Sequence, residues 1–379
     1  MSETPARSGT PEPLAQSDDA HFMALALSLG RRGLGRTWPN PAVGAVIVKD
    51  GVIAGRGWTQ PGGRPHAEVE ALQRAGEAAR DATLYVTLEP CSHQGKSPPC
   101  ADAIIAAGIS RVVSALEDPN PEVAGAGHSR LRAAGIVVEV GPGADEARRD
   151  HAGHIRRIHD GRPHVMLKLA ISADGKVGAA GRKPIAITGE AVRERVHLMR
   201  AQSDAVMIGI GTALVDDPLL TCRLPGMAKN SPVRIVLDSA LRLPLESRLA
   251  STARQVPVWV IAGMDAPDAE AEALRARGVE VLRVVASGGR LGLAAVLKIL
   301  AERGITRLMV EGGPTLAAAF VAADLVDRAD LFFSPTVVGA GGIDALEGMP
   351  LTALTRSEAL TRVASCLVGD DRHESFERR

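Results

Sequence analysis

Short apolar runs alternate with helix-forming segments along most of this 379-residue chain, and this alternation limits the folds that it can adopt. In the first half, the apolar runs TLYVTLE and RVVSAL stand on either side of the helical segment CADAIIAAG. A second series follows, with apolar runs such as HVMLKLA, AVMIGIG and VPVWVIA. Strands separated by helices form a mostly parallel sheet that is covered on both faces. The sequence therefore predicts an α/β protein.

A charged segment interrupts the alternation and marks a domain boundary. DEARRDHAGHIRRIHD, over 145–160, predicts a helix that ends near Gly161 and Pro163. The length of the chain also suggests two domains. We expect a disordered tail over 1–19, a first domain over 20–144, a linker helix over 145–162 and a second domain over 163–379.

Turn chemistry and helical spacing place several elements. Two β-rich runs flank Lys49-Asp50-Gly51, and Asp-Gly suits the tight turn of a hairpin. Apolar residues at helical spacing predict helices over 66–79, 190–201, 268–277, 291–303 and 314–323.

The composition narrows the classes of function. Lys plus Arg and Asp plus Glu number 44 each, so no overall charge favours nucleic acid or anionic lipid. No run of about 18 apolar residues predicts a membrane span, and the polar first twenty residues do not resemble a secretory signal. The chain has four cysteines, which fits a reducing compartment, and we expect it in the cytoplasm.

Two of the cysteines lie in one loop, EPCSHQGKSPPC, over 89–100. An upstream histidine in PHAEVEAL completes a candidate ligand set of His66, Cys91 and Cys100. A catalytic zinc typically takes three protein ligands, and two thiolates with an imidazole suit it. The order H-x-E followed by P-C is that of zinc nucleobase deaminases. The sequence therefore predicts a zinc site that performs deamination.

Glu68 supplies the proton chemistry in this hypothesis. It lies at the start of a predicted helix, two residues after His66, so it can take a proton from the attacking water and return it to the leaving ammonia. Lys96, in the loop between the cysteines, offers a cation for a small anionic substrate such as a sugar phosphate. A closed structural zinc site, with His93 as a fourth ligand, is the alternative.

The second half lacks the G-x-G-x-x-G dinucleotide fingerprint. It has instead the strand RLMVE followed by Gly312-Gly313-Pro314-Thr315 at the start of a predicted helix, where backbone N–H groups can bind phosphate. Taken alone, a strand-to-helix turn of this kind is more often structural than part of a phosphate site. Asp216-Asp217-Pro218 is likewise either part of a site or a turn with a helix cap, and the residues alone leave both alternatives open.

Several stretches resemble the bifunctional deaminase/reductase family of riboflavin biosynthesis. They run in the order of that family and include PNPAVGAVIVKDG, HAEVEAL, YVTLEPCSHQGKSPPC, DPNPEVAGAG, KLAISADGK, AQSDAVMIGIGTALVDDPLLTCR and VEGGPTLA. The resemblance implies an N-terminal cytidine-deaminase-like three-layer α/β/α domain and a C-terminal dihydrofolate-reductase-like α/β domain. It also implies Zn²⁺ and NADPH as cofactors, and a pyrimidine ribosyl phosphate that is first deaminated and then reduced to its ribityl form.

The resemblance implies roles for particular residues. In the first domain these are the zinc ligands His66, Cys91 and Cys100, the proton donor Glu68, and Asn40 near the pocket. In the second domain the implied NADP contacts are Ala170, Ala186, Thr212, Asp216, Ser239, Gly313, Pro314, Thr315, Leu316, Ala317, Ala318 and Ala319. The implied substrate contacts are Pro184, Arg200, Leu220, Arg223 and Glu311.

One segment departs from the family. Many relatives carry Ser-x-Trp-Ile-Thr where this chain has Pro184-Ile185-Ala186-Ile187-Thr188. Pro184 and Ala186 supply neither a hydroxyl nor an indole, so the packing of the cofactor there differs from that pattern.

Two other functions compete with this interpretation. One is a deaminase of nucleic-acid bases with a C-terminal binding module, which the zero net charge and only nine aromatic residues (five Phe, three Trp and one Tyr) disfavour. The other is a non-enzymatic scaffold that zinc stabilises. We expect a small-molecule pyrimidine ribosyl phosphate as the substrate, no nucleic-acid or membrane partner, and a homo-oligomer.

Overall fold

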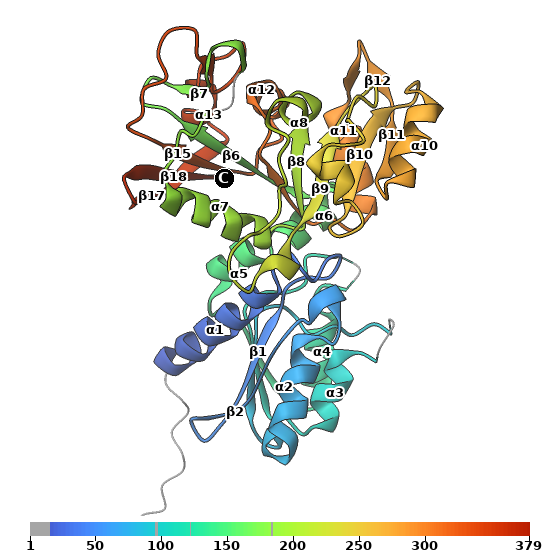
Figure 1. Ribbon diagram of the computed structural model, residues 1–379. Helices are drawn as coiled ribbons and strands as arrows, with labels where there is room; N and C mark the ends of the chain where they lie inside the picture. Colours follow the sequence, from blue (N-terminus) through green and yellow to red (C-terminus); the bar gives the residue numbers. More distant parts are fainter. Residues whose placement is uncertain (1–15, 95–97, 122, 183–184) are drawn as a thin grey trace, which may run out of the picture. The chain divides into compact units, whose positions relative to one another are not determined.

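The computed structural model describes residues 16–94, 98–121, 123–182 and 185–379. The chain forms two compact units (Figure 1). The N-terminal unit consists of the described residues of 16–33, 42–60 and 64–151, and the C-terminal unit consists of those of 34–41, 61–63 and 152–379. Two short segments from the first part of the chain therefore belong to the C-terminal unit.

The N-terminal unit contains a five-stranded sheet with the order β2-β1-β3-β4-β5. β1 pairs antiparallel with β2 and β3, whereas β3, β4 and β5 are parallel. The strands are β1 (Gly44–Lys49), β2 (Val52–Trp58), β3 (Thr83–Val86), β4 (Arg111–Ser114) and β5 (Val137–Val140). The helices are α1 (Gln16–Gly30), η1 (Arg31–Gly33), α2 (Ala67–Ala75), η3 (Gly76–Ala79), α3 (Cys100–Ala106), α4 (Ala126–Ala133) and α5 (Ala144–Asp150).

Two glycines allow helices to lie close to both faces of this sheet. A Cβ on Gly44 would lie 1.8 Å from the carbonyl oxygen of Ala26 in α1, and one on Gly57 would lie 2.3 Å from that of Ala67 in α2. Gly57 pairs with Ala45, the neighbour of Gly44, so the two glycines point to opposite faces. α1 and α2 therefore cover opposite faces, and the unit has three layers, α/β/α.

The C-terminal unit contains a nine-stranded sheet with the order β11-β10-β9-β8-β14-β6-β15-β18-β17. Neighbours from β11 to β15 are parallel, and the hairpin of β17 and β18 adds two antiparallel strands. The strands are β6 (His164–Ile171), β8 (Ala205–Gly209), β9 (Val233–Leu237), β10 (Val258–Gly263), β11 (Glu280–Val284), β14 (Arg307–Val310), β15 (Arg328–Phe333), β17 (Leu360–Val368) and β18 (Asp371–Arg378). The small sheets pair β7 (Lys176–Gly178) with β16 (Ile343–Asp344), and β12 (Ala286–Ser287) with β13 (Arg290–Leu291).

Helices cover both faces of the large sheet, which explains the almost continuous apolar runs of its strands. Met207 on β8 belongs to the core that includes α11 and α12, whereas its neighbours Val206 and Ile208 belong to a second core with α9 and α10. The helices are η2 (Pro61–Gly63), α6 (Ala152–Asp160), η4 (Ala180–Arg182), α7 (Glu190–Ala201), α8 (Ile210–Asp216), η5 (Ala228–Asn230), α9 (Arg248–Ser251), α10 (Asp268–Ala276), α11 (Leu293–Glu302), α12 (Pro314–Ala322) and α13 (Thr352–Thr355).

Most of the elements predicted from periodicity and turn chemistry are confirmed. α7 spans the predicted 190–201, and α10, α11 and α12 end within two residues of the predicted limits. The hairpin of β1 and β2 turns at Asp50 and Gly51, which have φ angles of 50° and 76°, as a primed turn requires.

Two segments differ from their expectations. The single helix expected over 145–162 is instead two helices, α5 and α6, and the boundary between the units falls between them, after 151. The tail expected over 1–19 is helical from Gln16 onward, and residues 1–15 lie outside the described part of the chain. Within the described residues, no helix is long and apolar enough to cross a membrane.

A buried charge cluster stabilises β15 and β18. The carboxylate of Asp330 accepts hydrogen bonds from Arg328 Nε at 2.7 Å and Nη2 at 3.0 Å, and its Oδ1 lies 2.8 Å from His373 Nε2. The ring of Phe332 stacks on His373. Burial opposes ionisation of Asp330, but the hydrogen bonds from His373 and Arg328 outweigh it and lower its pKa to about 2.

This low pKa predicts an acid-dependent loss of stability. Between pH 4 and pH 2 the unfolded chain takes up a proton at Asp330 before the folded chain does, so the free energy of unfolding falls as the pH falls. Asp330→Asn should remove about 2 kcal/mol of that fall. It should also destabilise the unit at neutral pH, because Arg328 loses one of its two carboxylate partners and keeps only Glu377. Urea unfolding of both proteins at several pH values measures this. Equal falls in the two proteins would contradict the assignment.

Candidate active sites

The predicted zinc ligands meet at the ends of three elements of the N-terminal unit. His66 precedes α2, Cys91 lies in the loop after β3, and Cys100 is the first residue of α3. His66 Nδ1 lies 3.3 Å from Cys100 Sγ and 3.7 Å from Cys91 Sγ, and the three ligand atoms are all within 4.8 Å of one another. His66 occupies the N-cap position without capping the helix, which leaves its imidazole free to face the thiols. The structure thus brings together residues 34 positions apart.

The donors of this cluster fit zinc. Two sulfurs and one imidazole nitrogen, with no carboxylate among them, are a typical ligand set for this metal. A hydrogen bond from Cys100 lowers the pKa of the Cys91 thiol to about 4, and the backbone N–H of Cys100 also donates to Cys91 Sγ. The same hydrogen bond, together with burial, raises the pKa of Cys100. The Cys91 thiol therefore ionises more readily than the Cys100 thiol, and a bound cation would favour the thiolate form of both.

Glu68 lies in the first turn of α2 and is almost completely buried, with 3% of its surface exposed. Burial raises the pKa of its carboxyl group, although the charge of His66 opposes this. A carboxyl group with a raised pKa can both accept and return a proton near neutral pH. The residue predicted to move protons thus has the environment that this role needs.

His93, the fourth ligand of the closed-site alternative, is exposed and does not belong to the cluster formed by the described residues. A second group of possible ligands consists of Glu89, Glu117 and His128. The carboxylate of Glu89 is already occupied, because it accepts hydrogen bonds from four backbone N–H groups. The arrangement of the three predicted ligands favours an open, catalytic site.

Two further residues predicted for the first site lie outside the described chain or in the other unit. Lys96 lies outside the described residues. Asn40 belongs to the segment Leu34–Pro41 of the C-terminal unit, where its side-chain amide donates a hydrogen bond to the carbonyl oxygen of Gly63 at 2.8 Å. This bond agrees with a structural role for Asn40 in its turn, and its contact with substrate stays a prediction.

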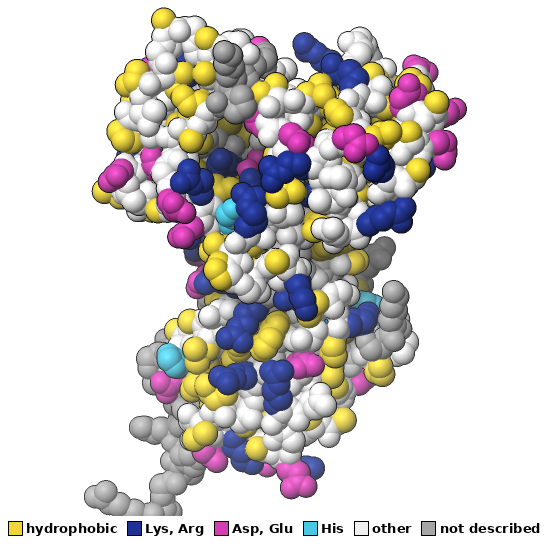
Figure 2. All heavy atoms as spheres, in the orientation of Figure 1, with side chains coloured by type: hydrophobic (Ala, Val, Ile, Leu, Met, Phe, Trp, Pro, Cys, Tyr) yellow, Lys and Arg dark blue, Asp and Glu magenta, His cyan; other side chains and the backbone are white. Residues whose placement is uncertain are grey.

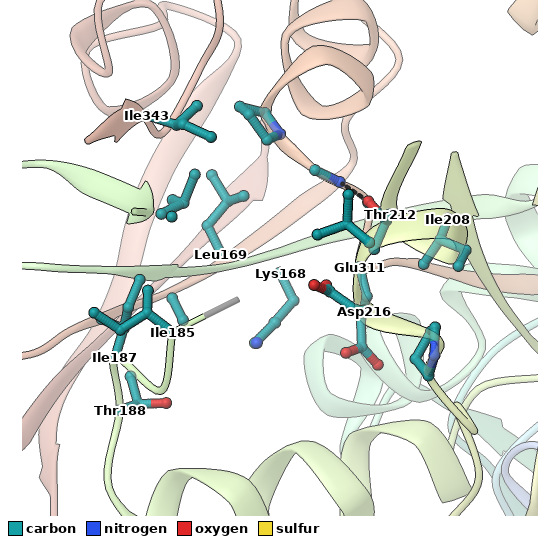
Figure 3. Close-up of a pocket in the computed structure, with 18 of the residues that line it drawn as sticks. Lys168, Leu169, Ile185, Ile187, Thr188, Ile208, Thr212, Asp216, Glu311 and Ile343 are labelled. Carbon is teal, nitrogen blue, oxygen red and sulfur yellow. Dashed lines mark hydrogen bonds between the residues drawn. The ribbon is translucent and has the colours of Figure 1, made fainter. Parts of the chain in front are cut away.

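The C-terminal unit has a pocket of about 420 Å³ beside the carboxyl ends of β6, β8 and β14 (Figure 3). Ligands of α/β sheets usually bind at this end of the strands. Lys and Arg side chains gather around a hollow on the face of this unit shown in Figure 2, and the pocket lining includes Lys168, Arg193 and Arg200. The lining also includes the carboxylates of Asp216 and Glu311, so cationic and anionic groups face the same cavity.

Nine of the residues predicted for this half line the pocket. They are Ala170, Ala186, Thr212, Asp216, Gly313 and Pro314 from the cofactor set, and Arg200, Leu220 and Glu311 from the substrate set. Thr212 on α8 accepts a hydrogen bond from the backbone N–H of Gly313 at 3.1 Å, which ties the glycine turn before α12 to the start of α8. Ile185, Ile187 and Thr188 also line the pocket, so the segment that departs from the family pattern still contributes to it.

The remaining predicted residues lie outside the pocket lining or outside the described chain. Ala317 and Ala318 are buried in the hydrophobic core, Leu316 packs against that core, and Thr315 bonds Glu347. Ser239 follows β9, and Arg223 is exposed. Pro184 is not among the described residues. The roles of these residues and of Ala319 stay predictions.

Arg200 and Glu311 form a buried ion pair at the pocket. Arg200 donates from Nε to Oε1 at 2.6 Å and from Nη2 to Oε2 at 2.8 Å, and both side chains are less than one-sixth exposed, at 13% and 8%. Burial opposes the charge of Glu311, but Arg200 outweighs it and holds the pKa of Glu311 below its usual value. Glu311 is thus an anion at neutral pH, held in one orientation.

Lys168 was not predicted from the sequence. It lies on β6, and its side chain points into the same cavity as Glu311 and Asp216 (Figure 3). Burial lowers the pKa of its ammonium group, while the Glu311 carboxylate opposes that effect. The run HVMLKLA contains this one charged residue at a position that points away from the apolar core of its neighbours Leu167 and Leu169. A lysine inside an otherwise apolar strand is the sequence signal that could have identified it.

The segment Asp216-Asp217-Pro218 serves as a helix end. α8 ends at Asp216, and Asp217 is its C-cap, with a φ of 37° and a carboxylate that accepts the backbone N–H of Arg248. Leu220 also has a positive φ, 54°, which is strained for a branched side chain. Strain of this kind is often found beside ligand sites. Asp216, Pro218 and Leu220 all line the pocket, so the turn that ends α8 also forms part of the pocket wall.

Comparison with known proteins identifies the family. The family described as RibD C-terminal domain matches residues 163–369, and the cytidine and deoxycytidylate deaminase zinc-binding region matches residues 16–116. The riboflavin biosynthesis protein RibD of Aquifex aeolicus is 44% identical over 323 residues, which is 85% of this chain and 88% of that protein. The chain belongs to the RibD family of riboflavin biosynthesis proteins.

Other RibD proteins agree with this assignment. RibD of Escherichia coli is 41% identical over 344 residues, or 87% of this chain and 92% of that protein. The Acinetobacter baumannii RibD structure, form 1, has a TM-score of 0.84 and 35% identity, and covers 96% of this chain and 99% of its own. As a RibD-family protein, the chain is a bifunctional deaminase and reductase that uses Zn²⁺ and NADPH and takes a small-molecule substrate of the riboflavin pathway. The expected fold classes of both domains are confirmed.

Proposed function

We propose that His66, Cys91 and Cys100 hold the catalytic zinc and that Glu68 moves the protons of the deamination. The convergence of the three donor atoms beside a buried Glu68 supports this assignment. Zinc, when bound, supplies a Lewis acid that lowers the pKa of water toward neutrality. Glu68 accepts the proton of the attacking water and returns it to the amine, which leaves the ring as ammonia.

We propose the substrate from the printed description of a relative. A Thermotoga maritima structure, 34% identical over 96% of this chain and 99% of its own and with a TM-score of 0.83, is described as a diaminohydroxyphosphoribosylaminopyrimidine deaminase/5-amino-6-(5-phosphoribosylamino)uracil reductase. This chain would act on 2,5-diamino-6-(5-phosphoribosylamino)pyrimidin-4(3H)-one. Water replaces the amine at the ring carbon and ammonia is released, and the product is then reduced at the ribosyl group.

For the reduction we propose that the 420 Å³ pocket brings the nicotinamide and the ribosyl group together. NADPH, when bound there, would supply the hydride for the sugar carbon C1, and a proton must reach the ring oxygen as the sugar opens. Lys168 and the anionic Glu311 face the same cavity, so the lysine can donate that proton while the carboxylate stabilises its charge. Arg200 fixes the orientation of Glu311 through its two hydrogen bonds.

A coupled assay tests both steps in one chain. Zinc-loaded protein given the diaminopyrimidine substrate should release one ammonia per substrate and afterwards oxidise one NADPH per deaminated product. Ammonia release without NADPH oxidation would reject the reductase assignment, and the absence of both would reject the substrate.

We propose that the protein works as a cytoplasmic homo-oligomer and does not act on nucleic acid. All four cysteines are free, which suits a reducing compartment. β17 is an edge strand of the large sheet with exposed Val363 and Leu367, and an unpaired edge of this kind can pair with a second copy. The balanced charge and the few aromatic residues support a small-molecule substrate.

We propose the following functional boundaries: a deaminase domain over 20–144, a connecting segment over 145–162 and a reductase domain over 163–379. The match over 163–369 supports the start of the reductase domain at 163, and most of the match over 16–116 falls within the proposed deaminase domain.

A further inference from the structure

Glu89 lies two residues before Cys91 and has no role in the mechanism above. It is buried, with 6% of its surface exposed. Its Oε2 accepts hydrogen bonds from the backbone N–H groups of Asp118 at 3.0 Å and Gly125 at 2.9 Å. Its Oε1 accepts those of Gly127 at 2.7 Å and His128 at 3.2 Å. One carboxylate therefore binds four amides of the described part of the segment 117–128.

The start of α4 explains why an anion suits this position. Gly127 and His128 belong to the first turn of α4, whose backbone N–H groups have no partners within the helix. A carboxylate there satisfies two of these groups and also interacts favourably with the positive end of the helix. The ring nitrogen Nδ1 of His128 is 3.8 Å from Glu89 Oε2, but the backbone amides are the close partners. Glu89 thus caps α4 from a different part of the chain.

The capped segment also contacts the residues around the zinc ligands. A Cβ on Gly127 would lie 2.0 Å from the carbonyl oxygen of Pro90, so only glycine permits this approach next to Cys91. Arg130 of α4 donates to the carbonyl oxygen of Ser92 at 3.3 Å and pairs with Asp102 at 2.6 Å. α4, which contains Gly127 and Arg130, is therefore attached on both sides of Cys91 and at Asp102, two residues beyond Cys100.

We propose that Glu89 is a positioning residue of the deaminase: it holds the described residues of 117–128 against the ligand-bearing loops and so fixes them as a wall of the pyrimidine site. This inference rests on the proposed deaminase function. The three ligand side chains do not depend on Glu89 for their donor atoms, so its loss displaces the wall and leaves the metal. Substrate binding, measured as KM, is the quantity that Glu89 controls.

Glu89→Gln tests this because it keeps the shape of the side chain. One of its two oxygens becomes an NH₂ group, which cannot accept hydrogen bonds and leaves two backbone N–H groups unpaired. Deamination should lose about 10- to 100-fold in kcat/KM, mainly through KM. Zinc content should stay unchanged, and NADPH oxidation with the deaminated product should also stay unchanged, which shows that the chain is folded. Hydrogen exchange over 117–128 should become faster.

Two further variants sharpen the test. Glu77→Gln is the control, since Glu77 is exposed in η3 and lies outside both the segment 117–128 and the metal cluster, and it should change deamination by less than about twofold. Gly127→Ala keeps Glu89 but forces the segment away from Pro90, and it should raise KM as Glu89→Gln does.

Three results would overturn the inference: an unchanged KM in Glu89→Gln despite faster exchange, loss of zinc in parallel with activity, or an unaffected Gly127→Ala. A wild-type protein that releases no ammonia would instead reject the proposed function itself.

Discussion

Glu68→Gln is expected to reduce ammonia release by about 10³-fold, because the amide cannot accept the proton of the attacking water. The substitution keeps the volume of a residue that is 3% exposed, so the packing of α2 against its neighbours should persist. The zinc content should remain that of the wild type, since Glu68 is not one of the three clustered donors. Ammonia assays and metal analysis on the same sample measure both quantities.

Glu70→Gln is the control for this substitution. Glu70 lies on the same helix and forms an i,i+4 pair with Arg74, and it belongs to no described cluster of metal donors. Such pairs contribute only about 0.3–0.5 kcal/mol, so activity should be unaffected. NADPH oxidation by the C-terminal unit should be the same in both variants. A Glu68→Gln protein that deaminates at more than a tenth of the wild-type rate would remove Glu68 from the mechanism.

Glu311→Gln is expected to abolish most of the reductase activity, with a loss of about 100-fold or more. The substitution removes the anion that faces Lys168 and leaves the buried Arg200 without its bidentate partner. An uncompensated buried charge also destabilises the fold by about 3–5 kcal/mol, so the melting temperature of the C-terminal unit should fall. NADPH oxidation with the deaminated pyrimidine as substrate measures the first effect, and thermal unfolding measures the second.

Deamination provides the internal control for Glu311→Gln, because it should remain at the wild-type rate in the same chain. Glu272→Gln removes a carboxylate from the exposed Glu272–Arg275 pair of α10 and should change neither activity nor stability measurably. Wild-type NADPH oxidation in Glu311→Gln would show that the buried pair is only structural.

Local rules predicted the regular elements because those elements depend on neighbouring residues. The turn at Asp50 and Gly51 and the helix α7 follow from turn chemistry and apolar spacing. The zinc ligands could be predicted because the residue types required by the metal are few and their order along the chain is informative. The split of 145–162 into α5 and α6 was missed, since continuous charged sequence gave no sign of an interruption after Asp150.

Long-range contacts explain what the sequence did not reveal. Lys168 is identified by the cavity that its side chain enters, and Glu89 by four amides that lie 29 to 39 residues further along the chain. The hairpin of β17 and β18 forms one edge of the large sheet. The residues of this hairpin carry no motif of the family, so the sequence did not indicate where they pair. Asn40 lies in a segment that groups with the C-terminal unit, and its expected contact with the deaminase substrate stays a prediction.

The most direct test of the account is to measure zinc content and ammonia release for the wild type, Cys100→Ala and the control Cys366→Ala, whose thiol is exposed and lies outside the metal cluster. The account predicts about one zinc per chain and full deamination in the wild type and in Cys366→Ala, and the loss of both in Cys100→Ala with NADPH oxidation retained. A Cys100→Ala protein that keeps its zinc and still releases ammonia would contradict the three-ligand site.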